Sequence, residues 1–367
     1  MGEALFARVA AREMANPTDL LGKRLLGRYK LTRVLGEGGM GVVLEARELA
    51  TDKLVAIKVL HTREAHVGSS FRRFQQEVRT AAMVGRPHVT EVYDVGMLAT
   101  GEPFFVMEKV EGDTLRQRIT RDRWLSLKDV VTIFIQLLMT LEAVHAKGII
   151  HRDIKPENII LSTGSGGRTD IKLIDFGVAK LVSPTPGKPM DITSTGVVVG
   201  TVWYASPEQV NGARDLDGRV DLWATGVCMI EALTGRRPFE AIDPLRLMLD
   251  ITRKPHPRVR ATRTDVPTEL DTILAKALRK TREDRYASAR AFRHDLVDMW
   301  NAHRQTRSSQ RHIEVHPETV PGYTDSEALT IDGTAVELPM RRVENAPPPP
   351  PEMLTRTQPG STRTPPV

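Results

Sequence analysis

A short loop segment concentrates side chains of the kind that phosphoryl transfer requires. The segment HRDIKPEN, residues 151–158, presents a carboxylate at Asp153, an ammonium at Lys155 and an amide at Asn158. Phosphoryl transfer needs little covalent chemistry from a protein but much positioning and charge neutralisation. We therefore expect Asp153 to align and deprotonate an attacking hydroxyl. Lys155 is expected to neutralise the transferred phosphate.

A second carboxylate follows in IKLIDFG, residues 171–177. Its Asp175 supplies oxygen ligands of the kind that hard divalent cations prefer. With the amide oxygen of Asn158 it predicts a site for Mg²⁺ or Mn²⁺ beside the phosphates of ATP. Either segment could occur by chance, but both in this order indicate ATP-dependent phosphoryl transfer.

The segment LGEGGMGVV, residues 35–43, carries a G-x-G-x-x-G pattern. Glycines let backbone amides approach phosphates without side chains in between. The pattern alone also fits a plain glycine-rich turn, and a dinucleotide-binding fold would need a helix to follow. Because a strand-like VVLEA follows instead, we expect a β-hairpin that folds over a nucleotide. The ATP-binding residues expected here are Leu35, Gly36, Glu37, Gly38, Gly39, Met40, Gly41 and Val43.

A lysine, Lys58, ends the apolar stretch VAIK at residues 55–58. An ammonium in such a strand is costly unless it meets anions, the alternative being that its head reaches solvent. Glu77 lies at the edge of the apolar face of a helix expected over residues 71–82. We expect its carboxylate to reach Lys58 and orient it toward phosphates, although Glu77 taken singly would be an ordinary solvated residue.

The elements that must position these groups change in kind along the chain. Short apolar or alternating runs predict strands first, and helical spacing of apolar residues dominates later. This order indicates a small sheet followed by a larger helical part. Strands are expected over 29–35, 42–46 and 55–60, and helices over 130–146, 220–233 and 270–278.

Three zones of different texture indicate the domain organisation. Residues 1–27 form a leader of uncertain order, and residues 28–302 alternate as a globular body should. The segment 303–367 holds many Ser and Thr and a run of five prolines at 347–351. Such a segment cannot bury enough apolar surface to fold alone, so we expect a disordered tail.

The composition excludes several classes of protein. The single cysteine allows no intramolecular disulfide, which fits a reducing compartment. No apolar run is long enough to span a membrane, and the first residues do not form a secretory signal. The net charge of +6 comes from basic residues scattered among acids, so no nucleic-acid partner is expected. The chain is predicted to be soluble and cytoplasmic.

These motifs in their order resemble the protein kinase superfamily, and more narrowly the bacterial Hanks-type (eukaryotic-like) serine/threonine kinases. The resemblance covers about residues 28–300 and includes LGEGGMGVV, VAIK, Glu77, MEKVEG, HRDIKPEN, DFG, SPEQ, DLWATG and DRYASA. It implies an α+β bilobal fold. The N-lobe would span about 28–107, the hinge 108–113 and the helical C-lobe about 114–302.

The resemblance also implies roles for residues outside the loops. Met107 would be the gatekeeper at the back of the nucleotide site, and Glu108 and Val110 would belong to the hinge that binds adenine through backbone groups. Ala56 and Val43 would enclose the adenine ring. In a structural role, Asp221 would brace the backbone of the catalytic loop, and Glu208 would pair with Arg285.

By the same resemblance, Lys155 and Thr201 imply Ser/Thr specificity, with dual specificity left open. Arg152 implies control by phosphorylation of the activation segment. Its expected phosphosites are Thr193 and Thr195, whose phosphates would pair with Arg152 and Lys180. An unmodified flexible segment is the alternative.

Two other functions remain open at this point. A pseudokinase would act as a scaffold through contacts alone, and a small-molecule phosphotransferase could share the fold. The expected partners are protein substrates, with self-association for trans-autophosphorylation.

Overall fold

The computed structural model describes residues 17–38, 41–60, 89–175, 199–311, 329–331 and 334–336. The chain divides into two units, Met1–Val315 and His316–Val367. In the second unit the described residues form an antiparallel pair of short strands, β10 (Leu329–Ile331) and β11 (Thr334–Val336). All groups discussed below belong to the first unit.

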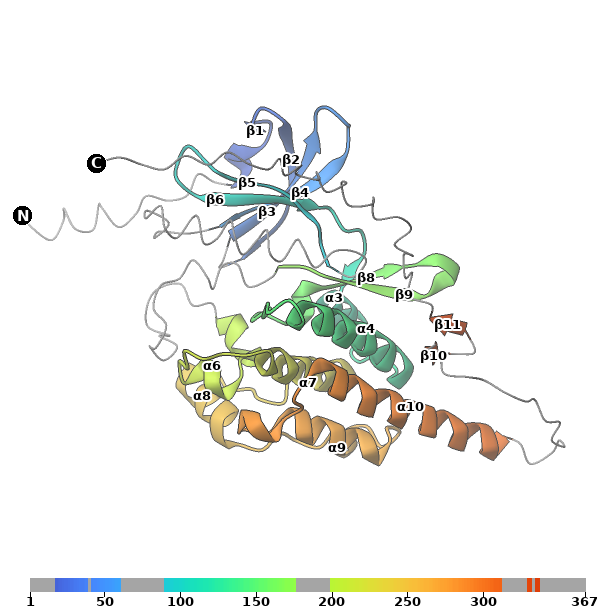
Figure 1. The fold of residues 1–367 in the computed structure, drawn as a ribbon. Helices are drawn as coiled ribbons and strands as arrows, with labels where there is room; N and C mark the ends of the chain where they lie inside the picture. Colours follow the sequence, from blue (N-terminus) through green and yellow to red (C-terminus); the bar gives the residue numbers. More distant parts are fainter. Residues whose placement is uncertain are drawn as a thin grey trace, which may run out of the picture. The chain divides into compact units, whose positions relative to one another are not determined.

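A six-stranded antiparallel sheet forms the first part of this unit (Figure 1). Turn residues separate its short apolar runs, so that neighbours in sequence pair as hairpins. The expected strands are confirmed, each slightly longer than its apolar run. In spatial order they are β1 (Arg24–Leu25), β2 (Tyr29–Gly38), β3 (Gly41–Glu48), β4 (Leu54–Leu60), β6 (Pro103–Glu108) and β5 (Val92–Met97).

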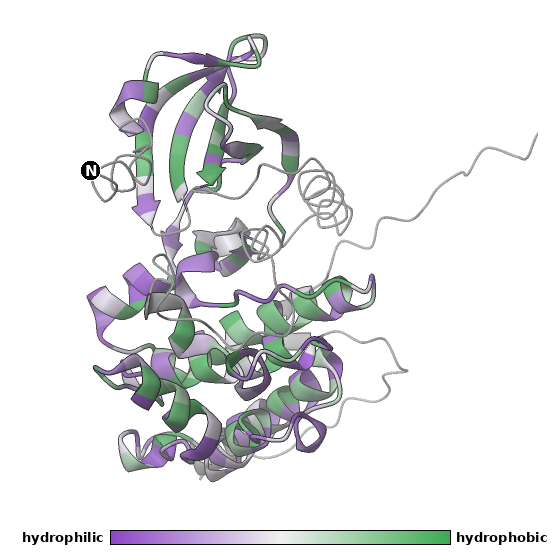
Figure 2. Ribbon diagram, turned by 90° about the vertical axis from the view of Figure 1, so that its left-hand side faces the viewer, coloured by the Kyte–Doolittle hydropathy of each residue, from purple (hydrophilic) through white to green (hydrophobic). Residues whose placement is uncertain are grey.

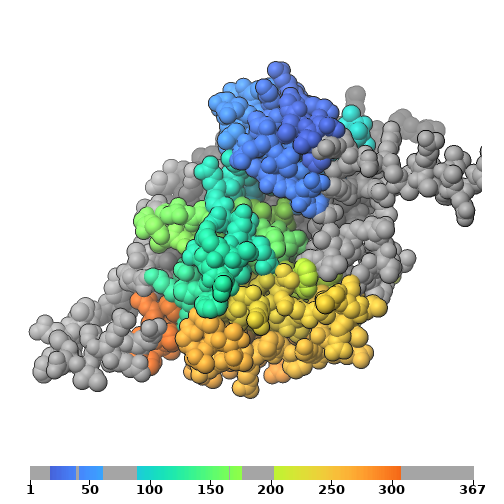
Figure 3. All heavy atoms as spheres, turned by 180° about the vertical axis from the view of Figure 1, so that it is seen from behind, coloured from blue at the N-terminus to red at the C-terminus, as the bar shows by residue number. Residues whose placement is uncertain are grey.

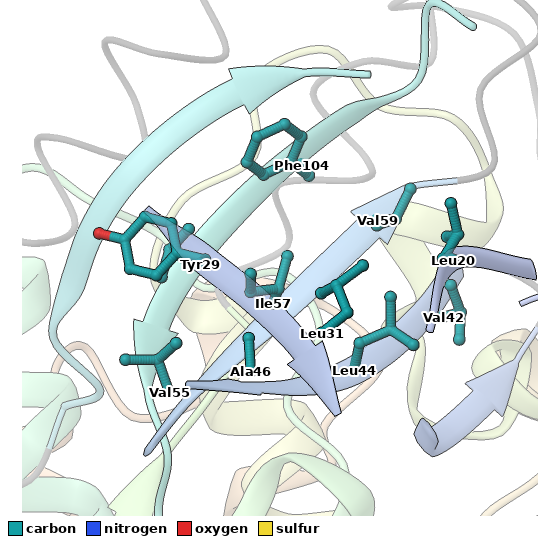
Figure 4. Close-up of a cluster of buried hydrophobic side chains, with 11 residues drawn as sticks. Leu20, Tyr29, Leu31, Val42, Leu44, Ala46, Val55, Ile57, Val59 and Phe104 are labelled. Carbon is teal, nitrogen blue, oxygen red and sulfur yellow. The ribbon is translucent and has the colours of Figure 1, made fainter. Parts of the chain in front are cut away.

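The two faces of this sheet bury different clusters, because successive residues of a strand point to opposite sides. One face carries the larger cluster, which includes Tyr29, Ile57 and Phe104 (Figure 4). Burying each such side chain stabilises the fold by about 1.5–3 kcal/mol. The other face carries the smaller cluster of Ala56, Leu60, Phe105 and Met107, with Val43, Val92 and Val95 packed against it.

The part that follows is mainly helical and lies on the opposite side of the hinge from the sheet (Figures 1 and 3). Apolar residues line its interior, whereas polar residues gather on its outer faces (Figure 2). The central helix α7 is buried along almost its whole length. The helices are α3 (Leu115–Asp122), α4 (Leu127–His145), α6 (Pro207–Val210), α7 (Arg219–Thr234), α8 (Pro244–Arg253), α9 (Thr268–Ala277) and α10 (Ala289–Arg311).

A side-chain cap sets where helix α4 begins. Ser126 accepts a hydrogen bond from the backbone N–H of Asp129, so α4 starts three residues before the expected 130. The helices expected over 220–233 and 270–278 are present as α7 and α9. The helix expected over 71–82 lies outside the described residues.

A small three-stranded sheet follows the hinge along the chain. It consists of β7 (Asp113–Thr114), β8 (Ile159–Thr163) and β9 (Thr169–Leu173). The two segments expected to do chemistry adjoin its strands: HRDIKPEN directly precedes β8, and DFG follows β9. The α+β bilobal architecture is therefore confirmed.

The expected domain limits remain predictions. Helix α10 runs through the boundary at 302 to Arg311. Within the part of the chain that the structure describes, no helix is both long and apolar enough to cross a membrane.

Candidate active site

Strands β2 and β3 form the expected glycine-rich hairpin, with Gly38 paired to Gly41. Gly41 has a φ of +153°, and a Cβ there would lie 2.1 Å from the carbonyl oxygen of Val59. Only glycine fits such an approach of two backbones. At Gly36 and Gly38 a Cβ would meet no atom of the described residues within 4 Å, so the described residues leave their backbone open to a ligand. Gly39 and Met40 lie outside the described residues.

Lys58 extends from β4 on the face of the smaller apolar cluster. Its Nζ donates a hydrogen bond to Oδ2 of Asp175 at 2.5 Å. Both side chains are largely buried, 13% and 14% exposed, so the ion pair is only weakly screened by solvent. The expected partner Glu77 lies outside the described residues. The structure thus joins the N-lobe lysine to the DFG aspartate, a contact that sequence reasoning did not predict.

The backbone conformation and the Oδ1 carboxylate oxygen of Asp175 suit a second ligand besides Lys58. Its backbone is left-handed, with φ 57°, a conformation that is costly for a residue with a Cβ and is common at functional sites. Its buried Oδ1 has no hydrogen-bond partner among the described residues. The described residues also contain no cluster of three or more acidic, His or Cys side chains that could hold a metal.

Those observations fit a cation held by few protein ligands. Mg²⁺ commonly binds one or two protein oxygens and completes its shell with phosphate and water. The carboxylate of Asp175 and the amide oxygen of Asn158 are ligands of this type. The amide nitrogen of Asn158 donates to the carbonyl of Asp153 at 2.8 Å, which fixes the orientation of the amide.

Asp153 lies at the centre of the catalytic loop and is 7% exposed. Its Oδ2 accepts a hydrogen bond from Nζ of Lys155 at 2.7 Å and one from Nδ2 of Asn158 at 3.1 Å. Both donors favour the ionised carboxylate. The side chains of Lys155 and Asn158 therefore both bond to the same carboxylate oxygen of Asp153, so that the three residues expected to act together are in contact.

The backbone of this loop is fixed by Asp221 of α7, as the resemblance implied. Its carboxylate accepts the N–H of His151 at 2.9 Å and that of Arg152 at 2.8 Å. Nε2 of His145 lies 2.8 Å from the same carboxylate. Arg152 has a left-handed φ of 64°, and these bonds hold the loop in that conformation.

His151 links the catalytic loop to the DFG segment. Burial lowers the pKa of His151 despite the nearby carboxylates of Asp221 and Asp153, so its ring is neutral near pH 7. The ring Nε2–H donates to the carbonyl of Ile174 at 3.1 Å, and Nδ1 accepts the N–H of Asp153 at 3.3 Å. His151 therefore holds Asp153 and Asp175 in register. Phe176 of the DFG segment lies outside the described residues.

The residues expected around adenine share the inner face of the sheet. Ala56 and Met107 pair across β4 and β6, and Val43 packs against the same cluster. Glu108 ends β6, and both of its carboxylate oxygens accept from Nζ of Lys172 at 2.6 Å. Val110 is half-buried in the hinge.

The end of the activation segment is anchored to the C-lobe. Glu208 forms a bidentate ion pair with Arg285, with both oxygens 2.7 Å from the guanidinium nitrogens. The expected pair is present. Thr201 lies in the 3₁₀ helix Val199–Tyr204. Thr193, Thr195 and Lys180 lie outside the described residues.

Sequence reasoning missed a second group of charges beside the catalytic loop. Arg116 of α3 donates to Glu157 at 2.8 Å and to Glu231 at 2.8 Å. Although burial opposes its charge, Glu231 raises the pKa of Arg116. The hydroxyl of Tyr204 donates to Glu231 at 2.6 Å. In the sequence, the only sign of this group was Glu231, a glutamate among the apolar residues of α7.

The comparisons with known proteins agree with this geometry. Residues 29–297 match the protein kinase domain. The chain is 36% identical over 296 residues to the serine/threonine-protein kinase pkn3 of Myxococcus xanthus, covering 80% of this chain and 54% of pkn3. It is 34% identical over 316 residues to PrkC of Bacillus subtilis, covering 86% of this chain and 47% of PrkC. The chain thus spans about half the length of these relatives.

A solved structure resembles the fold. The crystal structure of the PknI kinase domain of Mycobacterium tuberculosis superimposes with a TM-score of 0.58 at 29% identity, covering 76% of this chain and 98% of that domain. Members of this family use ATP and a divalent metal ion. From the matched domain and these relatives, the chain belongs to the protein kinase family and is similar to its bacterial Hanks-type serine/threonine members.

Proposed function

We propose that this protein transfers the γ-phosphoryl group of ATP to Ser and Thr hydroxyls of proteins, including its own activation segment. The observation that carries the proposal is the convergence on Asp153. The side chains of Lys155 and Asn158 both donate to its Oδ2. This arrangement fixes the carboxylate in one orientation for use as a base.

The reaction follows from these positions. The substrate hydroxyl oxygen forms a bond to the γ-phosphorus, the bond from phosphorus to the bridging oxygen of ADP breaks, and the hydroxyl proton passes to Asp153. Lys155 neutralises charge on the transferred group, and Lys58 binds phosphate oxygens of ATP once it is released from Asp175. Asn158 and Asp175 would hold the divalent ion, for which we propose Mg²⁺ and, as a substitute, Mn²⁺. When bound, this ion neutralises phosphate charge.

We also propose that activity rises when Thr193 and Thr195 are phosphorylated in trans by a second copy. Each phosphate adds nearly two negative charges, for which Arg152 and Lys180 are the expected partners. The bonds from Asp221 to the backbone at residues 151 and 152 hold the base of Arg152 in place for this role.

Incubation with labelled ATP tests the proposal. We expect label on the protein itself and on a generic basic protein, on Ser and Thr after acid hydrolysis, and not with Asp153→Asn. Label on a small molecule alone would favour the small-molecule phosphotransferase. Nucleotide binding without any transfer by the wild type would favour the pseudokinase.

Phosphatase treatment tests the second part. We expect the treated enzyme to lose most of its initial rate and to recover it on incubation with ATP, faster at higher enzyme concentration. Undiminished activity after dephosphorylation would contradict control through the activation segment.

A further inference from the structure

A buried glutamate on the inner face of the sheet has no role in the chemistry above. Glu45 of β3 is 7% exposed and pairs with Ala56 across β4. It therefore shares the face that is expected to cover adenine. A carboxylate beside such an apolar cluster is costly unless it is fully partnered.

Three groups partner this carboxylate, and they come from both ends of the nucleotide site. Nζ of Lys109, in the hinge, lies 2.9 Å from Oε2. From β2, Nη2 of Arg33 donates to Oε2 at 3.1 Å, and the hydroxyl of Thr32 donates to Oε1 at 3.0 Å. Glu45 thus joins the first strand of the glycine hairpin to the hinge.

The contact with Thr32 falls at an irregularity in the hairpin. The register of β2 against β3 shifts between Leu31 and Arg33, so Thr32 is the extra residue of a bulge. The Thr32 hydroxyl also lies 3.1 Å from the backbone oxygen of Glu45. A bulge bends and twists its strand. Glu45 therefore fixes the bend just before β2 reaches Gly36 and Gly38.

The hinge end of this link is itself anchored. Glu108 is held by Lys172 of β9, and Lys109 is held by Glu45 of β3. Two consecutive hinge residues are thus tied to opposite lobes. A movement of the hairpin relative to the hinge must break the pair on the β3 side.

The burial of the pair makes it stronger than a surface ion pair. The side chains of Glu45 and Lys109 are 10% and 16% exposed, whereas that of Arg33 is 62% exposed. Hydrogen bonds from Arg33 and Lys109 lower the pKa of Glu45 to about 2, so it is ionised near neutral pH. Removing Glu45 would leave the largely buried ammonium of Lys109 with only the more distant and exposed carboxylate of Glu111, 4.0 Å away.

We propose that Glu45 is a positioning residue for ATP. Glu45 joins the bulge at Thr32 to Lys109 of the hinge and thereby holds the glycine hairpin at a fixed height over the nucleotide. This inference rests on the proposed ATP site. Glu45 acts through the hairpin and contacts none of the reacting atoms. Its loss weakens nucleotide binding and leaves the chemical step intact.

Glu45→Gln tests this, because the amide keeps the shape and loses the charge. We expect the KM for ATP and the Kd for ADP, measured by calorimetry, to rise about five- to twentyfold. We expect kcat to stay within about twofold, since the bonds to Asp153 are untouched. Faster hydrogen exchange across residues 31–38 should accompany the change.

Glu48→Gln is the matched control. Glu48 lies on the same strand, is 6% exposed and accepts from Thr51 and Arg28, away from the hinge. We expect it to leave the Kd for ADP unchanged. An equal rise in the Kd for both variants would mean that Glu45 has only a general structural role, and would overturn the proposal.

Lys109→Met and the double variant complete the test. If the two residues act as one unit, Lys109→Met alone should weaken ADP binding as Glu45→Gln does, and the double variant should be no weaker than either. Additive losses, or an unchanged Kd in Glu45→Gln, would refute the link. An inactive wild type that binds ADP would contradict the proposed function, while the Kd comparison would still decide the role of Glu45.

Discussion

The catalytic loop and the glycine hairpin both contribute to the proposed nucleotide site but are held in different ways. Asp221, from the buried helix α7, bonds to the backbone of the loop at two successive residues, and Asp153 has two side-chain donors. The hairpin is held at its base by Glu45, and a Cβ at Gly36 or Gly38 would meet no described atom within 4 Å. The groups proposed for the chemistry are thus held by a buried helix, whereas the hairpin is held by strand pairing and is joined to the hinge through Glu45 and Lys109.

The difference predicts a division of labour. Changes in the loop should lower the rate of transfer, because preorganised charges act on the transition state. Changes in the hairpin should lower affinity for nucleotide. Lys58 belongs to the sheet yet bonds to Asp175 of the other lobe. Its replacement should therefore lower both the rate of transfer and the affinity for nucleotide.

Apart from replacement of Asp153 itself, the largest effect is expected for Lys58→Met. It removes a buried positive charge from the phosphate site and leaves Asp175 without its partner. We expect kcat/KM to fall about 10²- to 10³-fold, measured as initial rates of peptide phosphorylation. Lys53→Met is the control, because Lys53 contacts Tyr93 at the far end of β4. A fall of less than fivefold in Lys58→Met would contradict a role in transfer.

Asp221→Asn sharpens the comparison from the loop side. The amide would turn one N–H donor toward the backbone donors at residues 151 and 152. We expect the free energy of unfolding to fall by about 2–3 kcal/mol, measured by urea denaturation, with a lower kcat. Asp217→Asn is the control, since Asp217 is 41% exposed and pairs with Arg219 at the surface. Equal losses of unfolding free energy in the two variants would contradict the role of Asp221 in bracing the catalytic loop.

Gly41→Ala addresses the hairpin. Its Cβ would clash with the backbone oxygen of Val59, so we expect about 2 kcal/mol of destabilisation in denaturant unfolding without nucleotide. Gly36→Ala has free space around its Cβ and should leave the stability of the apo protein nearly unchanged. The opposite order would mean that the hairpin is not paired as described.

The smallest effect is a pH dependence at Glu45. Its pKa is lowered from 4.5 to about 2 in the folded state, so the unfolded chain binds more protons between these values. The stabilisation is therefore present above about pH 4.5 and is lost as the pH falls toward 2. The difference in unfolding free energy between wild type and Glu45→Gln should shrink from pH 5 to pH 3. A constant difference would show that Glu45 is not ionised in its site.

The local motifs predicted much of this arrangement because each chemical role is encoded within a few residues. The spacing of Asp153, Lys155 and Asn158 implied that they act together, and the structure joins all three. The apolar alternation of β3 and β4 likewise predicted a sheet beneath the glycine turn. These three side chains lie within one short loop, so that their spacing is visible in the sequence, although Asp221 of α7 fixes the backbone of that loop.

Interactions between distant segments were not predictable in the same way. Nothing in the local pattern joins Glu45 to Lys109, or Arg116 to Glu231, because each pair depends on how separate elements pack. A glutamate inside the apolar run VVLEA gave a signal like that of Lys58, but it did not indicate a partner. The start of α4 was misplaced because the cap at Ser126 outweighed apolar periodicity.

Single-turnover transfer and ADP affinity, measured side by side on Asp153→Asn and Glu45→Gln, test the division of labour most directly. The account predicts that Asp153→Asn slows transfer by about 10²- to 10⁴-fold with an unchanged Kd for ADP. Glu45→Gln should raise that Kd and keep the transfer rate at saturating ATP. If both variants lower the same quantity, the separation between a fixed catalytic loop and an ionically held nucleotide cover is contradicted.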